Sequence, residues 1–287
     1  MMVEFNGTDV IIMTCSDCNT NCKHCYIGYS GNFDGDYLYN LCLELKKKYN
    51  IYLNGTEILL HEEYFKTIEL LKQDYLLTNG LILYKNERLM EKLKNIGIKH
   101  IDMSYHFGIH DDISQVKYHI IGDNIRRLLK YNIRTEIRTT ISSKNYKMIE
   151  SMIKQAYDMG AEGIKFTNYM QLGNAKNLDF KYVMDDNELK EFFKYLNNAR
   201  SKYDINDFRI RRCGSFENDL VKGHDSFECV AGTKSVAITP NLNVYPCFFL
   251  TSPGYEIGYV ENDKIFVDNN FKNNGAKCLT RNIVRGG

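Results

Sequence analysis

The sequence predicts an α/β fold in which a partial (β/α)6 TIM-like barrel is followed by a small cysteine-rich α+β domain. Two observations support this prediction. Six short β-branched segments alternate with amphipathic helical segments, and the chain then changes to short strand-like pieces among turn residues and cysteines. Six strand–helix units in series favour a parallel sheet with right-handed crossovers, and six units rather than eight favour an open barrel. A full barrel and a doubly wound sheet remain alternatives, because the pattern alone does not separate them.

Apolar and β-branched residues mark the six expected barrel strands. These are Val10–Thr14, Ile51–Asn54, Tyr75–Thr78, His100–Tyr105, Thr135–Ile141 and Gly163–Tyr169. Between them, apolar residues recur with the spacing of amphipathic helices, and one such pattern places Cys42 in the core. Gly97 and Gly160 follow two of these patterns, where glycine commonly ends a helix.

After the sixth strand the pattern changes. Asp185 and its polar neighbours can cap a helix that continues through Leu196. Short strands are then expected at Phe208–Arg211, Ser235–Thr239, Asn243–Tyr245 and Lys264–Val267. We expect a barrel over residues 1–180, a linking helix over 181–205 and a C-terminal domain over 206–287. A core of about 80 residues is marginal alone, and a bound metal cluster would add stability.

Charge and hydropathy exclude several classes of partner. The 287 residues include 37 basic and 36 acidic side chains, which leaves no electrostatic footprint for nucleic acid or an anionic membrane. The apolar stretches are far shorter than the roughly 20 residues that span a bilayer, and no secretory signal is visible. We expect a soluble, cytoplasmic protein with no nucleic-acid or membrane partner.

Nine cysteines need a chemical explanation. In a long chain without an export signal, an odd number of clustered cysteines favours metal binding over disulfides. Cys18, Cys22 and Cys25 follow directly on the first expected strand. Three thiolates on one loop can bind three irons of a 4Fe–4S cubane and leave the fourth iron open, as a reactive site requires. A zinc site is the alternative.

The C-x3-C-x2-C motif on this loop, with Thr14, Asn19 and Tyr26 around it, resembles the radical S-adenosylmethionine superfamily. The resemblance implies that S-adenosylmethionine chelates the open iron through its amino and carboxylate groups. An electron from the reduced cluster then cleaves it to methionine and a 5′-deoxyadenosyl radical, which abstracts a hydrogen from the substrate. A flavodoxin- or ferredoxin-type protein would donate that electron.

Further matches to this superfamily lie at the C-terminal ends of the expected strands, where parallel α/β folds bind ligands. One segment resembles the family's Gly-Gly-Glu contact to the methionine amino group, and others resemble contacts to the ribose, carboxylate and adenine. The implied cofactor-binding residues are Gly55, Thr56, Glu57, Asn79, Ser104, Arg138 and Leu172. Each also has a structural alternative, such as a tight turn at Asn79 or a buried ion pair for Arg138.

Four further cysteines, Cys213, Cys229, Cys247 and Cys278, lie in the last third. Their surroundings resemble the Twitch and SPASM domains of the superfamily, which hold auxiliary 4Fe–4S clusters. A full SPASM pattern has a cysteine where this chain has Arg281, so the resemblance favours one auxiliary cluster held by the four thiols. Alternatively, Cys213 is free and returns a hydrogen atom to the substrate radical, or the four cysteines bind zinc.

Members with such domains often modify ribosomally made peptides by crosslinking, epimerisation or side-chain oxidation, and this is the function we expect. The triad begins close to the N-terminus, which leaves no room for a preceding peptide-recognition domain and weakens this expectation. The alternative is dehydrogenation of a small alcohol, with the second electron passing to the auxiliary cluster. A non-catalytic zinc-binding scaffold is the alternative from another class.

Overall fold

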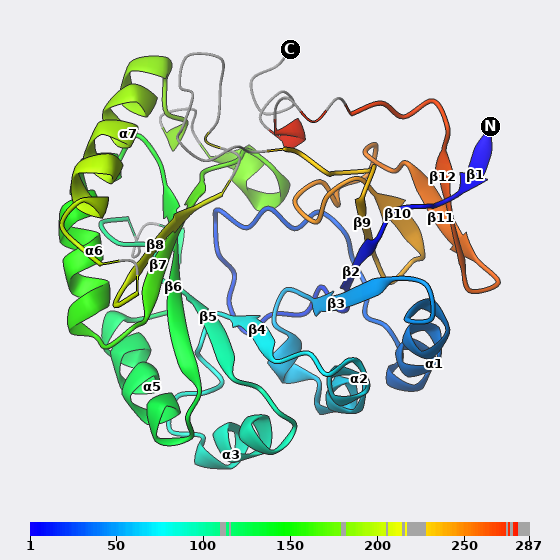
Figure 1. Ribbon diagram of the computed structural model, residues 1–287, viewed down its shortest axis with the longest axis horizontal. Coiled ribbons are helices and arrows are strands. Elements are labelled where there is room, and N and C mark those ends of the chain that lie inside the picture. The colour runs from blue at the N-terminus through cyan, green and yellow to red at the C-terminus, as the bar shows by residue number, and fades with distance from the viewer. Residues whose placement is uncertain are drawn as a thin grey trace.

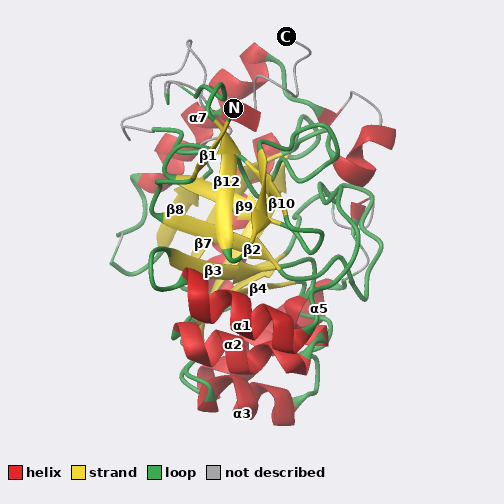
Figure 2. Cartoon of the chain, turned by 90° about the vertical axis from the view of Figure 1, so that its right-hand side faces the viewer, coloured by secondary structure: helices red, strands yellow, loops and turns green. Residues whose placement is uncertain are grey.

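The computed structural model of the chain describes residues 1–109, 113–114, 116–178, 182–204, 206–213, 216, 228–273, 275 and 278–280. Its strands form two sheets that curve into an open ring, and the helices lie outside this ring (Figure 1). Figure 2 shows α1 (Gly35–Leu45), α2 (Phe65–Leu71) and α3 (Glu87–Asn95) stacked on the outer side of the strands. Arg281 lies outside the described residues.

All six predicted barrel strands are present. They are β2 (Asp9–Met13), β3 (Asn50–Asn54), β4 (Tyr75–Thr78), β5 (His100–Ser104), β6 (Arg134–Ile141) and β7 (Gly163–Asn168). β2 pairs with β3 in parallel in one sheet, and β4 to β7 pair in parallel in the other. The barrel is therefore not closed by hydrogen bonds between β3 and β4, and the prediction of a partial barrel is confirmed.

The side chain of Gln73 joins the two sheets. Its Oε1 accepts a hydrogen bond from the Leu53 N–H of β3 at 2.7 Å. Its Nε2 donates to the Leu53 carbonyl at 2.9 Å and to the Tyr75 carbonyl of β4 at 2.8 Å. Because buried backbone groups need partners, this buried amide replaces the ladder that β3 and β4 do not form.

The remaining helices are α5 (Tyr118–Lys130), α6 (Ile149–Asp158) and α7 (Asp186–Arg200). Cys42 is buried on the inner face of α1, and Gly97 and Gly160 follow α3 and α6 with φ of +95° and +84°, as predicted. Asp185 caps α7, and Glu188 completes a capping box by accepting the Asp185 N–H at 3.0 Å. Among the described residues, no helix has the length and apolar composition needed to cross a membrane.

The later strands extend both sheets of the barrel. They are β8 (Arg209–Arg212), β9 (Ser235–Ile238), β10 (Asn243–Tyr245), β11 (Gly258–Glu261) and β12 (Lys264–Asp268). β8 pairs in parallel with β7, and β9 pairs in parallel with β2. β10, β11 and β12 continue as an antiparallel meander, against which β1 (Met2–Glu4) pairs. The division at residues 180 and 205 stays a prediction, and the hydrogen bonding shows that the last part shares both sheets with the first.

Candidate active site

A cavity of about 520 Å³ lies at the carboxyl ends of the parallel strands. Its lining includes the three cysteines of the triad and five of the residues predicted to contact a cofactor. These five are Gly55, Thr56, Asn79, Ser104 and Arg138. Since parallel α/β folds place ligands at this end of their strands, the structure brings these residues together where a ligand is expected.

The triad cysteines lie on one loop that faces the cavity, and none forms a disulfide. The Sγ atoms of Cys18 and Cys22 both approach one oxygen, Thr20 Oγ1, at 3.1 and 3.5 Å. Desolvation raises the pKa of Cys25 to about 11, and the neighbouring Cys22 and Cys18 contribute to this increase. The charges of two neighbouring thiols oppose the ionisation of Cys25, and a bound cation would reverse this effect.

The loop after β7 holds the cysteine loop in place. The backbone N–H of Asn174 donates to the Cys25 carbonyl at 2.9 Å. Gly173 packs directly against the same loop, because a Cβ at this position would lie 2.5 Å from Ile27 O and 2.6 Å from Cys25 O. A glycine is therefore required for the two loops to approach this closely.

Glu57 lies behind the cavity wall and is not among the residues that line the cavity. Its carboxylate is fully buried and accepts hydrogen bonds from the Thr78 hydroxyl at 2.8 Å and the Asn79 N–H at 2.8 Å. Burial raises its pKa to about 7. The Asn79 side chain in turn donates to Asn19 at 2.8 Å and lies 3.5 Å from Cys18 Sγ. Glu57 thus positions the turn beside the triad, and its contact with a cofactor stays a prediction.

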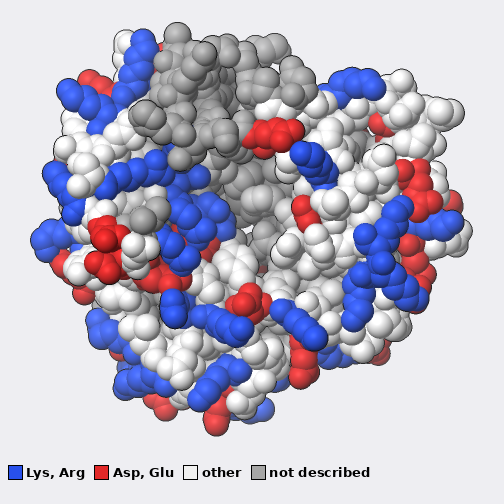
Figure 3. Space-filling view, in the orientation of Figure 1, with Lys and Arg blue, Asp and Glu red and all other residues white. Residues whose placement is uncertain are grey.

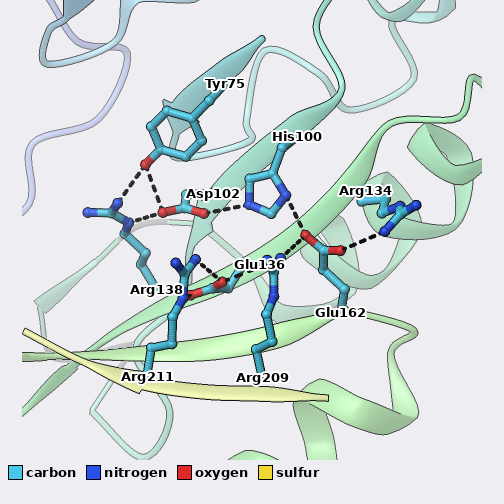
Figure 4. Close-up of polar contacts among 9 residues, drawn as sticks. All are labelled: Tyr75, His100, Asp102, Arg134, Glu136, Arg138, Glu162, Arg209 and Arg211. Atoms are coloured by element: carbon cyan, nitrogen blue, oxygen red, sulfur yellow. Dashed lines mark hydrogen bonds and ion pairs between the residues drawn. The ribbon is translucent and has the colours of Figure 1, made fainter. Parts of the chain in front are cut away.

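Arg138 and Leu172 are placed differently by the structure. Arg138 lines the cavity, while its guanidinium forms an ion pair with buried Asp102 and donates to the Tyr75 hydroxyl at 2.5 Å (Figure 4). The structural ion pair predicted as an alternative is therefore present. Leu172 does not line the cavity and packs in an apolar cluster that also contains Cys247.

The four later cysteines form a second group. The thiols of Cys229 and Cys278 are hydrogen-bonded, which lowers the pKa of Cys229. Burial raises the pKa of Cys247 to about 12, with added contributions from Cys213 and Cys229. The hydrogen bond with Cys229 and burial raise the pKa of Cys278, and the charge of Cys213 adds to this increase. Cys213 and Cys247 pack against the same apolar cluster, and none of the four cysteines lines the cavity.

The spacing of the thiols bears on the choice between zinc and a larger cluster. With Zn–S bonds of about 2.3 Å, tetrahedral geometry requires sulfur atoms about 3.8 Å apart. Within the described part of the chain, one group of three or more candidate ligand atoms lies within 4.8 Å of one another, and it consists of His100, Asp102 and Glu136. Among the described residues, no three cysteine sulfurs form such a group, and the choice between zinc and a 4Fe–4S cluster stays a prediction.

Aromatic side chains between the two cysteine groups were not predicted as a unit. Tyr26, Phe248 and Phe249 all line the cavity. The ring centroids of Tyr26 and Phe249 are 4.9 Å apart, and those of Phe248 and Phe249 are 4.1 Å apart. The sequence carried a signal for them, because Tyr26 directly follows Cys25 and the two phenylalanines directly follow Cys247.

No protein-family model and no curated protein sequence matches this chain. Among solved structures, Streptococcus suis SuiB bound to its precursor peptide SuiA is similar with a TM-score of 0.67 and 13% identity, over 88% of this chain and 62% of that one. The chain therefore spans less than two thirds of SuiB. The enzyme anSMEcpe with bound AdoMet and the Cp18Cys peptide is similar with a TM-score of 0.67 and 17% identity, over 89% of this chain and 78% of that one. The resemblance to radical S-adenosylmethionine enzymes that the sequence predicts is thus confirmed at the level of the fold.

Proposed function

We propose that the chain is a radical S-adenosylmethionine enzyme. In this proposal Cys18, Cys22 and Cys25 hold a 4Fe–4S cluster, with which the enzyme reductively cleaves S-adenosylmethionine and removes a hydrogen from its substrate. The observation that carries the proposal is the convergence of the three thiols and five strand-end residues on one cavity. When bound, the cluster supplies the electron and an open iron for the cofactor.

The chain's own residues would bind, orient and shield these groups. Gly55 lets the end of β3 pack closely against the end of β2, because a Cβ there would lie 2.7 Å from Thr14 Oγ1 and 3.0 Å from Cys15 Sγ. Ser104 and Asn79 line the cavity together with Tyr26, Phe248 and Phe249, whose rings would shield bound groups from water. Exclusion of water matters because a reactive intermediate must meet the substrate before the solvent.

For the substrate we infer a ribosomally made peptide that is crosslinked, epimerised or oxidised at a side chain. Two solved structures with this fold contain a peptide, SuiB with SuiA and anSMEcpe with Cp18Cys. Dehydrogenation of a small alcohol is the second candidate. An assay of wild-type turnover on precursor peptides against small alcohols separates the two.

We further propose that Cys213, Cys229, Cys247 and Cys278 hold one auxiliary 4Fe–4S cluster. The mutual effects of their thiols support this assignment. Two cubane clusters predict about eight irons and about eight sulfides per chain. C247A should lower both to about four, and an unchanged count would contradict the assignment.

The main test is anaerobic reconstitution followed by dithionite and S-adenosylmethionine, with 5′-deoxyadenosine measured by mass spectrometry. We expect the wild type to form 5′-deoxyadenosine and C22A to form none. C42A is the matched control, because Cys42 is buried on α1 and does not line the cavity. Undiminished product from C22A, or a protein with about two zinc ions and no sulfide, would refute the proposal and favour the zinc scaffold.

A further inference from the structure

A row of three cations crosses the barrel interior next to the cavity. The strand register places Arg138 of β6 opposite Lys165 of β7, and Lys165 opposite Arg211 of β8. Successive side chains of a strand point to opposite faces, so Lys165 shares the face of Thr167. Thr167 and Arg138 both line the cavity. The ammonium of Lys165 therefore lies inside the barrel, one step of the strand away from the cavity wall.

The outer two cations of the row have carboxylate partners, and the middle one does not. Arg138 pairs with Asp102, and Arg211 pairs with Glu136, with its Nε 3.1 Å from Oε1. Figure 4 shows that the nearby carboxylates are all engaged by arginines or by a histidine. Among the described residues, Lys165 has no ion pair and no hydrogen bond through its side chain.

Such a position destabilises the folded chain. Like charges directly opposite one another on neighbouring strands repel, and Lys165 has a guanidinium on each side. Burial and the charge of Arg138 lower the pKa of Lys165, while the charges of Cys213 and Asp102 act in the opposite direction. Lys and Arg also gather beside the central hollow of the molecule, over β8 (Figure 3). A cation that has no ion pair and lies beside a cavity is explained if a ligand supplies the missing anion.

We propose that Lys165 binds a carboxylate of the substrate. The inference rests on the proposed function and names a chemical class for its substrate, a peptide with an acidic side chain or a free C-terminal carboxylate.

The test uses thermal unfolding of the reconstituted holoenzyme in saturating S-adenosylmethionine. Three probes are compared at equal ionic strength: N-acetyl-aspartate amide for a side-chain carboxylate, N-acetyl-alanine for a C-terminal carboxylate, and neutral N-acetyl-asparagine amide. At about ten times its Kd, a carboxylate probe should raise the Tm of the wild type by about 2 °C, and the neutral probe should not. The carboxylate probe that gives the larger Tm increase shows whether Lys165 binds a side-chain carboxylate or a C-terminal carboxylate.

The carboxylate-dependent shift should vanish in K165M and persist in K165R. K154M is the matched control, because Lys154 is exposed on α6 and pairs with Asp158. In the absence of a probe, K165M should also have a higher Tm than the wild type. If K165M does not fold, K165Q provides the second neutral variant.

Equal shifts in the wild type and K165M would overturn the proposal, and so would no shift in the wild type. Loss of S-adenosylmethionine affinity by tenfold in K165M would assign the row to the cofactor and overturn the assignment to the substrate. Because the Tm measurement needs no turnover, the absence of a carboxylate-dependent Tm shift does not bear on whether the enzyme forms 5′-deoxyadenosine. Absence of 5′-deoxyadenosine in the wild type would likewise refute the proposed function without altering the binding result.

Discussion

Replacement of Gly173 by alanine should separate the loop after β7 from the cysteine loop. The new Cβ would lie 2.5 Å from Ile27 O and 2.6 Å from Cys25 O, and backbone atoms cannot rotate away as side chains can. Overpacking of this kind costs about 1–3 kcal/mol. Gly173 also has φ of +53°, and an L-residue with this left-handed backbone conformation loses about 1–2 kcal/mol more of folding free energy. The free energy of unfolding should therefore fall by about 2–5 kcal/mol.

The assay for G173A combines urea unfolding with iron and sulfide analysis after anaerobic reconstitution. Because the displaced loop carries Cys25, iron should fall from about eight to about four per chain as the triad cluster is lost. G97A is the matched control, since Gly97 has φ of +95° and a Cβ there meets nothing within 4 Å. If G173A keeps its iron and loses no more stability than G97A, the packing of Gly173 does not hold the cluster loop.

Two further variants test the junction of the sheets and the buried carboxylate. Q73A leaves the buried N–H and carbonyl of Leu53 without partners and should cost about 2–5 kcal/mol in urea unfolding. Q155A, at a half-buried position of α6, should cost less than about 0.5 kcal/mol. Burial raises the pKa of Glu57 to about 7 from an ordinary value of 4.5, so the folded state binds its proton more tightly than the unfolded state does. The stability of the wild type should thus fall by about 3 kcal/mol as the pH rises from 4.5 to 7, and E57Q should remove this slope. Equal slopes in the two proteins would show that Glu57 is not the group responsible.

Much of the barrel could be predicted because its signals are local. Runs of β-branched residues mark the six strands, Gly97 and Gly160 mark two helix ends, and the polar segment at Asp185 forms the expected cap. The pairing of β8 with β7 and of β9 with β2 could not be predicted, because pairing between distant segments depends on tertiary packing. The short strands β1 and β11 were not among the strands predicted.

The site shows the same division between local and long-range signals. The triad and the strand-end residues could be predicted, because the carboxyl ends of parallel strands meet at one edge of the fold. The position of Glu57 could not, because the burial of its carboxylate against Thr78 depends on where β4 lies. The alternation of Lys165 and Thr167 with Ile164 and Phe166 is visible in the sequence, but only the register of β6, β7 and β8 shows which face is the interior.

The open barrel explains why its interior is polar beneath the cavity. A ring that is not closed by hydrogen bonds between β3 and β4 needs long side chains to fill its centre, and here these are charged. The Glu162 carboxylate lies 2.5 Å from His100 Nδ1 and 3.6 Å from Arg134 Nη1, near the amino ends of the strands (Figure 4). These two ion pairs complete the network on the side away from the cavity. The four arginines of that network and Lys165 outnumber its three carboxylates. This local excess of positive charge favours entry of an anionic group from the open carboxyl end, although the whole chain carries a net charge of only +1.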